Sequence, residues 1–328
     1  MMIIYTPPKA AESIPLIDLG PSFSGDLQAR KGVAWELHKA AVDTGFFYIE
    51  NHGVPQEMLD GQLALAKAFF DLPLAEKHKV DVAKSNCTRG YEAPGLQTLD
   101  DGSPPDLKEG FLIGNDLASD HPYVVAGVPN CGSNQWPDKP EGFRATYEAY
   151  IEEMFRVGRH IHRLLALSLD MPEDYFDEGL VEPLFNGRLL KYAPQPENAA
   201  FNQIGAGAHT DWGMITILLQ DSVGGLEVEN ADGDWIAAPP IPGTFVVNLG
   251  EMVRVLTNGL YRSNMHRVLN NHSGVDRYSV PTFFDPNYFY EVKCVPSLMP
   301  ENGKPDFPPT TVGGHIADMY RKTYGLAA

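Results

Sequence analysis

The fold of this chain is indicated most clearly by residues 214–238, which read MITILLQDSVGGLEVENADGDWIAA. Short runs rich in aliphatic and aromatic residues alternate here with two hairpin-type turn signals, GG at 224–225 and ADGD at 231–234. Runs of the same kind flank this stretch, at residues 188–192, 244–249 and 278–284. Many short strands at close spacing favour a sandwich or barrel over a parallel sheet with crossover helices. We therefore expect a mainly β core from residue 188 onward.

Upstream of these strands the pattern changes to helices. Apolar residues recur every three or four positions in three segments, a period typical of amphipathic helices. These segments are residues 29–43, 56–70 and 144–169. Short strands are expected at residues 14–19 and 46–49. Residues 87–140 are rich in Gly, Pro, Asp and Asn, which predicts an irregular connection of the kind that often carries binding residues.

Composition and charge limit the classes of partner. The formal net charge of −18 argues against nucleic acid and against an anionic membrane surface, because like charges repel. The same charge would favour the approach of a cationic substrate, although it does not describe a pocket. The N-terminus lacks the basic region of a signal peptide, no long apolar stretch follows, and the three cysteines are widely spaced. We expect a cytoplasmic protein with no membrane span and no obligatory protein partner.

His209, Asp211 and His266 supply two imidazoles and one carboxylate. In an extended segment His209 and Asp211 point to the same face, whereas Thr210 points to the other. His266 follows 57 residues after His209, which is enough chain for several strands to return beside the first. This set matches the 2-His-1-carboxylate triad that holds Fe(II) and leaves coordination positions open. A single histidine is more often solvated or hydrogen-bonded than a ligand, so the prediction depends on the set as a whole.

Arg277 and Ser279 lie on one face of a later strand and predict a site for an anion. A guanidinium presents a planar fork to a carboxylate, and a nearby hydroxyl can add a hydrogen bond. Tyr192 could present its phenol to the same anion. The alternatives are a surface arginine in an ion pair and a strand tyrosine packed in the core.

Other histidines fit a ligand role less well. His160 and His162 are spaced i and i+2 on a predicted helix, where side chains face apart. His52 and His272 fall in turn-like sequence. We expect structural or solvated roles for these four.

These residues belong to a larger set of motifs that resembles one known family. The chain is similar to the isopenicillin N synthase-like family of Fe(II)/2-oxoglutarate-dependent oxygenases, with the motifs in family order from residue 14 to about residue 288. The matching stretches are residues 14–19 (IPLIDL), 45–53 (GFFYIENHG), 69–77 (FFDLPLAEK), 89–91 (RGY), 207–213 (GAHTDWG), 240–250 (PIPGTFVVNLG), 257–259 (TNG), 263–268 (SNMHRV) and 276–281 (DRYSVP).

The resemblance implies a double-stranded β-helix (jelly-roll) core with an N-terminal helical region and a long supporting helix. It implies Fe(II) held by His209, Asp211 and His266, and 2-oxoglutarate bound by Arg277, Ser279 and Tyr192, so that the iron site itself is the catalytic centre. The expected division is a single oxygenase domain over residues 1–328. Its parts are an N-terminal helical and irregular part (1–140), supporting helices (141–187), the jelly-roll core with the metal site (188–290) and a C-terminal segment (291–328).

Two positions depart from the family pattern. The asparagine that often stands two residues before the tyrosine is Leu190 here, which leaves the co-substrate contacts of that strand open. The common Gly-Asp after the strand at 244–249 is Gly250-Glu251, a change that we expect not to touch the triad.

The implied reaction uses O2 and 2-oxoglutarate to oxidise an unactivated C–H bond of a small molecule, by hydroxylation, desaturation or cyclisation, with release of succinate and CO2. One alternative is an Fe(II)-dependent oxidase of the same fold that does not use 2-oxoglutarate. The other is a non-catalytic metal- or ligand-binding jelly-roll protein.

Substrate contacts are predicted by position alone. About half of the candidates should prove to be packing residues, because neighbours on a strand face opposite ways. Arg89 could recognise an anionic group, which would oppose the cationic preference suggested by net charge. The candidates are Arg89, Tyr91, Trp212, Phe283 and Phe284.

Overall fold

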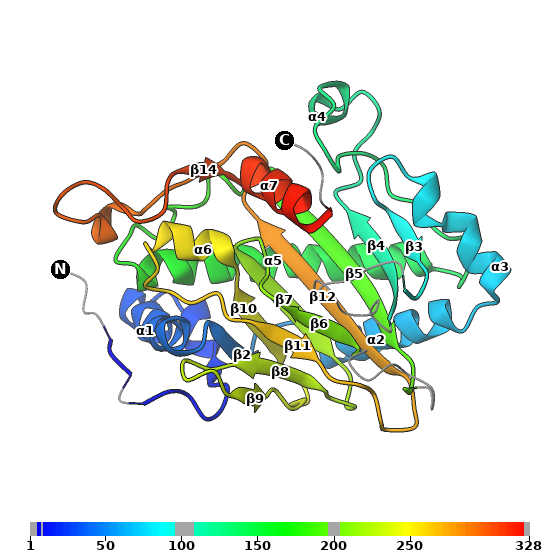
Figure 1. The fold of residues 1–328 in the computed structure, drawn as a ribbon, viewed down its shortest axis with the longest axis horizontal. Helices are drawn as coiled ribbons and strands as arrows, with labels where there is room; N and C mark the ends of the chain where they lie inside the picture. Colours follow the sequence, from blue (N-terminus) through cyan, green and yellow to red (C-terminus); the bar gives the residue numbers. More distant parts are fainter. Residues whose placement is uncertain (1–4, 8, 96–107, 196–203, 325–328) are drawn as a thin grey trace.

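An eight-stranded sheet runs through the middle of the molecule (Figure 1), in the order β1-β2-β10-β7-β12-β5-β4-β3. The structure, a computed structural model, describes all residues except 1–4, 8, 96–107, 196–203 and 325–328. The strands of this sheet are β1 (Leu16–Asp18), β2 (Phe46–Glu50), β3 (Gly90–Glu92), β4 (Glu109–Gly114), β5 (Leu184–Tyr192), β7 (Ile215–Gln220), β10 (Phe245–Leu249) and β12 (Arg277–Asp285).

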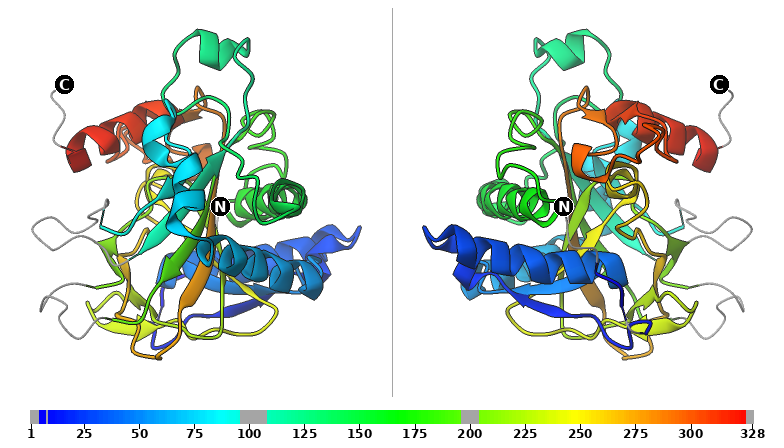
Figure 2. Two further views of the ribbon diagram at one scale, coloured as in Figure 1. Left: turned by 90° about the vertical axis from the view of Figure 1, so that its right-hand side faces the viewer. Right: turned by 90° about the vertical axis from the view of Figure 1, so that its left-hand side faces the viewer.

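A second, four-stranded sheet lies against one face of the first (Figure 2), in the order β6-β11-β8-β9. Its strands are β6 (Ala206–His209), β8 (Leu226–Glu229), β9 (Trp235–Ala237) and β11 (His266–Val268). A short pair, β13 (Glu291–Val292) and β14 (Thr310–Thr311), stands apart. The two facing sheets confirm the expected double-stranded β-helix core, and every strand predicted after residue 188 is present.

Helices α1 (Leu27–Asp43), α2 (Gln56–Phe70) and α5 (Phe143–Ser168) lie on the opposite side of the larger sheet (Figure 2). All three agree with the predicted helices to within two residues. No helix among the described residues is long and apolar enough to cross a membrane. The remaining helical segments are α3 (Leu74–Lys77), α4 (Pro122–Val125), α6 (Glu251–Leu256), α7 (Val312–Tyr324), η1 (Gly20–Phe23), η2 (His78–Val80), η3 (Val82–Lys84) and η4 (Pro296–Leu298).

The core has two layers, one on each face of the larger sheet. On β2, Phe47 and Ile49 join the cluster under the helices, while Phe46 and Tyr48 join the cluster between the two sheets. Successive side chains of a strand point to opposite faces, so a strand buried on both faces is apolar throughout. This explains the unbroken run FFYI at residues 46–49.

Gly45 connects α1 to β2 at a point where no side chain would fit. Its φ is +66°, and a Cβ atom there would lie 2.3 Å from the carbonyl oxygen of Arg262. Only glycine combines this left-handed backbone with so close an approach. The segment that passes over Gly45 leads directly into β11, which begins at His266.

The segment 87–140 is more regular than expected. It contains β3 and β4, which extend the sheet beyond β5, and the short helix α4. Helices α6 and α7 were not predicted either. β4 is ordered by pairing with β5, which comes much later in the chain, and β3 is ordered by pairing with β4.

Candidate metal centre and active site

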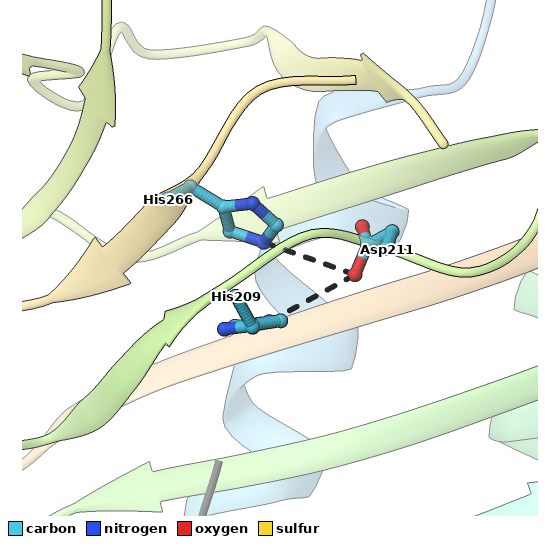
Figure 3. Close-up of side chains that lie close together, drawn as sticks. All are labelled: His209, Asp211 and His266. Atoms are coloured by element: carbon cyan, nitrogen blue, oxygen red, sulfur yellow. Dashed lines mark ion pairs between the residues drawn. The ribbon is translucent and has the colours of Figure 1, made fainter. Parts of the chain in front are cut away.

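His209, Asp211 and His266 converge at one end of the smaller sheet (Figure 3). His209 ends β6 and is paired in register with His266, the first residue of β11. The Nε2 atoms of both histidines lie 3.8 Å from Oδ1 of Asp211. Their potential ligand atoms all lie within 4.8 Å of one another. The strands therefore bring together the three ligand types that the sequence predicted.

Both histidines are oriented by backbone carbonyls. Nδ1 of His209 donates to the carbonyl oxygen of Gly207 at 2.7 Å, and Nδ1 of His266 lies 3.4 Å from that of Asn264. This arrangement selects the tautomer whose Nε2 lone pair is open to a metal. The donor set thus fits a divalent iron, which accepts imidazole nitrogen and carboxylate oxygen.

Within the described part of the chain, the hydrogen bonds that hold the Asp211 carboxylate go to one of its oxygens. Its Oδ2 accepts hydrogen bonds from Thr216 Oγ1 at 2.5 Å and from Asn248 Nδ2 at 2.7 Å. Both partners come from strands of the larger sheet, β7 and β10. The other oxygen, Oδ1, faces the two imidazoles and is directed towards the metal position.

The protonation states also suit metal binding. Burial, followed by the neighbouring His266, lowers the pKa of His209 to about 3, so its ring is neutral at physiological pH. Burial alone would raise the pKa of Asp211, but His266, His209 and the hydrogen bonds from Asn248 and Thr216 outweigh it and lower that pKa. A metal binds neutral imidazole and ionised carboxylate without first having to displace a proton.

Glu251 contacts the segment that carries the metal ligands. This corrects the expectation that the change from Gly-Asp to Gly250-Glu251 does not touch the triad. Thr210 Oγ1 donates to Glu251 Oε1 at 2.6 Å, and the Glu251 backbone N–H donates to the carbonyl of Asp211 at 2.8 Å. The other carboxylate oxygen lies 3.1 Å from Nε2 of His315 on α7. Glu251 therefore links α6 and α7 to the residue between two metal ligands.

A cavity of about 90 Å³ connects the three metal ligands to Arg277 and Ser279. Arg277 is 2% exposed, and its Nη atoms lie 3.5 Å from Ser279 Oγ and Gln220 Oε1. Its guanidinium stacks over the Tyr192 ring at 4.8 Å. Among the described residues no carboxylate pairs with Arg277, and its Nε has no hydrogen-bond partner. A buried arginine with donors to spare is a site for an anion.

Leu190 and Lys108 also line this cavity. Leu190, at the position where the family often has asparagine, makes the wall beside Tyr192 apolar. Lys108, buried just before β4, was not predicted, because it lies in the segment expected to be irregular. No pattern in the sequence identifies it.

A larger cavity, of about 210 Å³, is also lined by His209 and Asp211. Trp212 and Phe283 line it, as predicted for substrate contacts. Gly313, Ile316 and Ala317 of α7 form part of its wall.

Arg89 also lines the larger cavity, and its guanidinium donates to the backbone carbonyls of Cys87, Thr88 and Asn130. The remaining two substrate candidates need correction. Tyr91 is buried away from the cavity and donates to Glu109 at 2.8 Å.

Phe284 is also a packing residue. It is fully buried and meets the ring of Phe155 on α5 at 5.2 Å. The pleat turns its neighbour Phe283 to the opposite side, as the alternation of side chains requires.

Asn186, Arg188 and Asp285 line the larger cavity and were not among the predicted residues. A signal was available for all three. Counting in steps of two from Tyr192 on β5 reaches Arg188 and Asn186, and the same count from Arg277 and Ser279 on β12 reaches Phe283 and Asp285.

Sequence comparisons agree with this geometry. A family model described as non-haem dioxygenase in morphine synthesis N-terminal matches residues 14–139, and one described as 2OG-Fe(II) oxygenase superfamily matches residues 184–286. A 2-oxoglutarate-Fe(II) type oxidoreductase of Emericella nidulans is 38% identical over 95% of this chain and 91% of its own length. A homoarginine-6-hydroxylase of Glycine max is 35% identical, over 93% of this chain and 95% of its own.

Solved structures share the fold. A full-length Neurospora crassa protein in complex with alpha-KG (2-oxoglutarate) and thymine superposes with a TM-score of 0.83 at 27% identity, covering 95% of this chain and 97% of that one. A 2OG-Fe(II) oxygenase family protein of Caulobacter crescentus gives 0.82 at 29% identity, covering 95% and 99%. The chain therefore belongs to the 2OG-Fe(II) oxygenase superfamily and is an oxygenase that uses Fe(II) and 2-oxoglutarate.

Proposed function

We propose that the chain oxidises a C–H bond of a small molecule at an iron held by His209, Asp211 and His266. The observation that carries this assignment is the single cavity between those ligands and Arg277. In this assignment Arg277 and Ser279 bind the far carboxylate of 2-oxoglutarate, and the Tyr192 ring supports the guanidinium from below.

Fe(II) bound at this triad would supply oxygen activation coupled to decarboxylation of 2-oxoglutarate, so that RH, O2 and 2-oxoglutarate give ROH, succinate and CO2. Thr216 and Asn248 keep the Asp211 carboxylate in one orientation. The apolar side chains of Leu190, Leu218 and Val268 keep water from the co-substrate cavity. Positioning and exclusion of water are the contributions of the protein.

The substrate side is the cavity that contains Trp212 and Phe283. Its volume, about 210 Å³, suits a small molecule. Relatives named for or solved with small molecules, such as the homoarginine hydroxylase and the Neurospora crassa complex with thymine, support this size class.

The test measures oxygen uptake and succinate together, with Fe(II) and 2-oxoglutarate, across a panel of small molecules. We expect one panel member to raise both in equal amounts. Asp211→Ala should abolish this turnover, whereas Asp232→Ala, an exposed carboxylate in a turn, should retain it. Full activity of Asp211→Ala would remove the triad assignment. Oxygen uptake without succinate would instead indicate an oxidase that does not use 2-oxoglutarate.

A further inference from the structure

The co-substrate cavity and the substrate cavity meet at four residues that line both of them. Two are the metal ligands His209 and Asp211, and the others are Arg188 and Phe283. Arg188 lies on β5 and Phe283 on the neighbouring strand β12, where Phe283 is paired with Asn186. A group bound beside Arg188 and Phe283 is therefore also beside the metal position.

The Arg188 guanidinium lies over an aromatic ring. Its guanidinium carbon lies 5.6 Å from the centroid of the Phe283 ring. A cation over the face of a ring is attracted by the ring quadrupole, which helps to hold the guanidinium beside Phe283. Because a guanidinium has five N–H donors, it can bind an oxygen acceptor in addition to contacts within the protein.

The cavity that Arg188 lines includes several aromatic and aliphatic side chains. Trp212 directly follows a metal ligand and lines the same cavity as Phe283. Leu112, Ile113 and Ile316 add apolar surface. Flat aromatic walls near one planar donor favour a flat ligand that carries an acceptor at its edge.

The other charged residues that line this cavity are less suited to hold the substrate. Arg89 donates to three backbone carbonyls. Asp285 accepts from the backbone N–H of Met214, and burial raises its pKa to about 7, so it is a weak anchor for a cation. With two arginines and two aspartates in its lining, the cavity does not share the strongly negative charge of the whole chain, which is −18.

We propose that the substrate is a small molecule with a flat ring that carries a carboxylate or carbonyl group. Arg188 binds the oxygen of that group, and the ring lies against Phe283 and Trp212. The inference rests on the proposed function, since it places the ring beside the iron site. Arg188 is then the residue that determines specificity. The substrate oxygen that accepts its hydrogen bonds belongs to a carboxylate or to a ring carbonyl.

The test is a calorimetric titration of the full chain with Fe(II) and 2-oxoglutarate under anaerobic conditions, which needs no turnover. The probes are benzoate, 2-pyridone, cyclohexanecarboxylate and benzylammonium. Benzoate or 2-pyridone should bind at least about tenfold more tightly than benzylammonium, because benzylammonium offers no acceptor to Arg188. Benzoate should also bind more tightly than cyclohexanecarboxylate, which lacks the flat ring. The stronger of benzoate and 2-pyridone identifies the form of the acceptor.

The variants separate Arg188 from the co-substrate site. Arg188→Met should weaken the acceptor probe by about tenfold while the Kd of 2-oxoglutarate stays the same. Arg188→Lys keeps the charge but loses the planar fork, so its affinity for the acceptor probe should lie between those of wild type and Arg188→Met. It replaces Arg188→Met in the comparison if that variant does not fold. Arg144→Met makes the same chemical change at an exposed position outside both cavities and should have no effect.

Three results would overturn the inference: no acceptor probe binds, benzylammonium binds best, or Arg188→Met weakens 2-oxoglutarate as much as the probe. Failure of the proposed function has a different signature. In that case succinate never forms with any panel member, although the probes still follow the expected order. If succinate forms but the probe affinities do not depend on Arg188, this inference is contradicted and the proposed function is not.

Discussion

At the scale of single residues, the metal site depends on how Asp211 is held. We predict that Asn248→Ala lowers the affinity for Fe(II) by about 10–100-fold, because it removes one of the two hydrogen bonds that orient the carboxylate. Titration with Fe(II) under anaerobic conditions measures this. Asn230→Ala removes a side-chain hydrogen bond to Ala11, far from the triad, and should leave the affinity unchanged. Equal affinities in wild type and Asn248→Ala would show that Thr216 alone is sufficient.

Arg277 offers a second prediction at this scale. Arg277→Lys should weaken 2-oxoglutarate by about 1–3 kcal/mol, because lysine keeps the charge but not the planar fork. The KM for 2-oxoglutarate at saturating substrate is the measurement. Arg267→Lys, a partly exposed residue paired with Glu227, is the matched control. An unchanged KM in Arg277→Lys would remove this residue from its proposed role.

At the scale of elements, α5 carries a buried histidine that should make stability depend on pH. Burial lowers the pKa of His162 to about 4 from an ordinary value of 6.5, although Nδ1 donates to the carbonyl of Gly158. Between these pH values the unfolded chain binds a proton that the folded protein does not, so stability falls as the pH falls through this window.

We therefore predict that wild type loses about 2 kcal/mol more unfolding free energy than His162→Met between pH 7 and pH 5. Urea denaturation of both metal-free proteins at the two pH values measures the difference. The other histidines are common to both proteins and cancel. Parallel losses in the two proteins would mean that His162 is accessible to protons in the folded state.

Helices α6 and α7 are joined to the metal-bearing segment through Glu251. Glu251→Ala should lower the free energy of unfolding by about 1–3 kcal/mol, because it removes the acceptor for Thr210 and the charge beside His315. It should also speed proteolytic cleavage within α7. Glu291→Ala breaks an exposed pair with Lys293 and should change stability by less than about 1 kcal/mol. If Glu251→Ala changed the free energy of unfolding no more than this control, the contacts of Glu251 would not contribute to stability.

At the scale of the whole molecule, the larger sheet combines strands of the N-terminal part with strands of the jelly-roll core. β1 and β2 flank β10 on one side, while β3 and β4 continue the sheet beyond β5 on the other. We propose that residues 1–328 form a single domain, and we predict one cooperative unfolding transition. Calorimetry should then give equal calorimetric and van't Hoff enthalpies, and residues 1–140 expressed alone should not fold. Two separate transitions would contradict this.

The sequence alone was sufficient for the elements with a strong local pattern. The predicted helices at 29–43, 56–70 and 144–169 are present, because a helical period is a property of neighbouring residues. The strands of segment 87–140 were not predicted, because β4 forms by pairing with the distant strand β5 and β3 pairs with β4, and such pairing leaves little trace in local composition.

The sequence by itself determined the chemical inventory of the site, since residue types in family order specify His209, Asp211, His266, Arg277 and Ser279. Only the tertiary structure decided which residues face each cavity. Phe283 and Phe284 are identical side chains in adjacent positions, and the pleat sends one to the cavity and the other to α5. Both faces of this sheet are buried, so the polarity of the side chains does not distinguish them. The faces differ in what packs on them, which is helices on one face and the second sheet on the other.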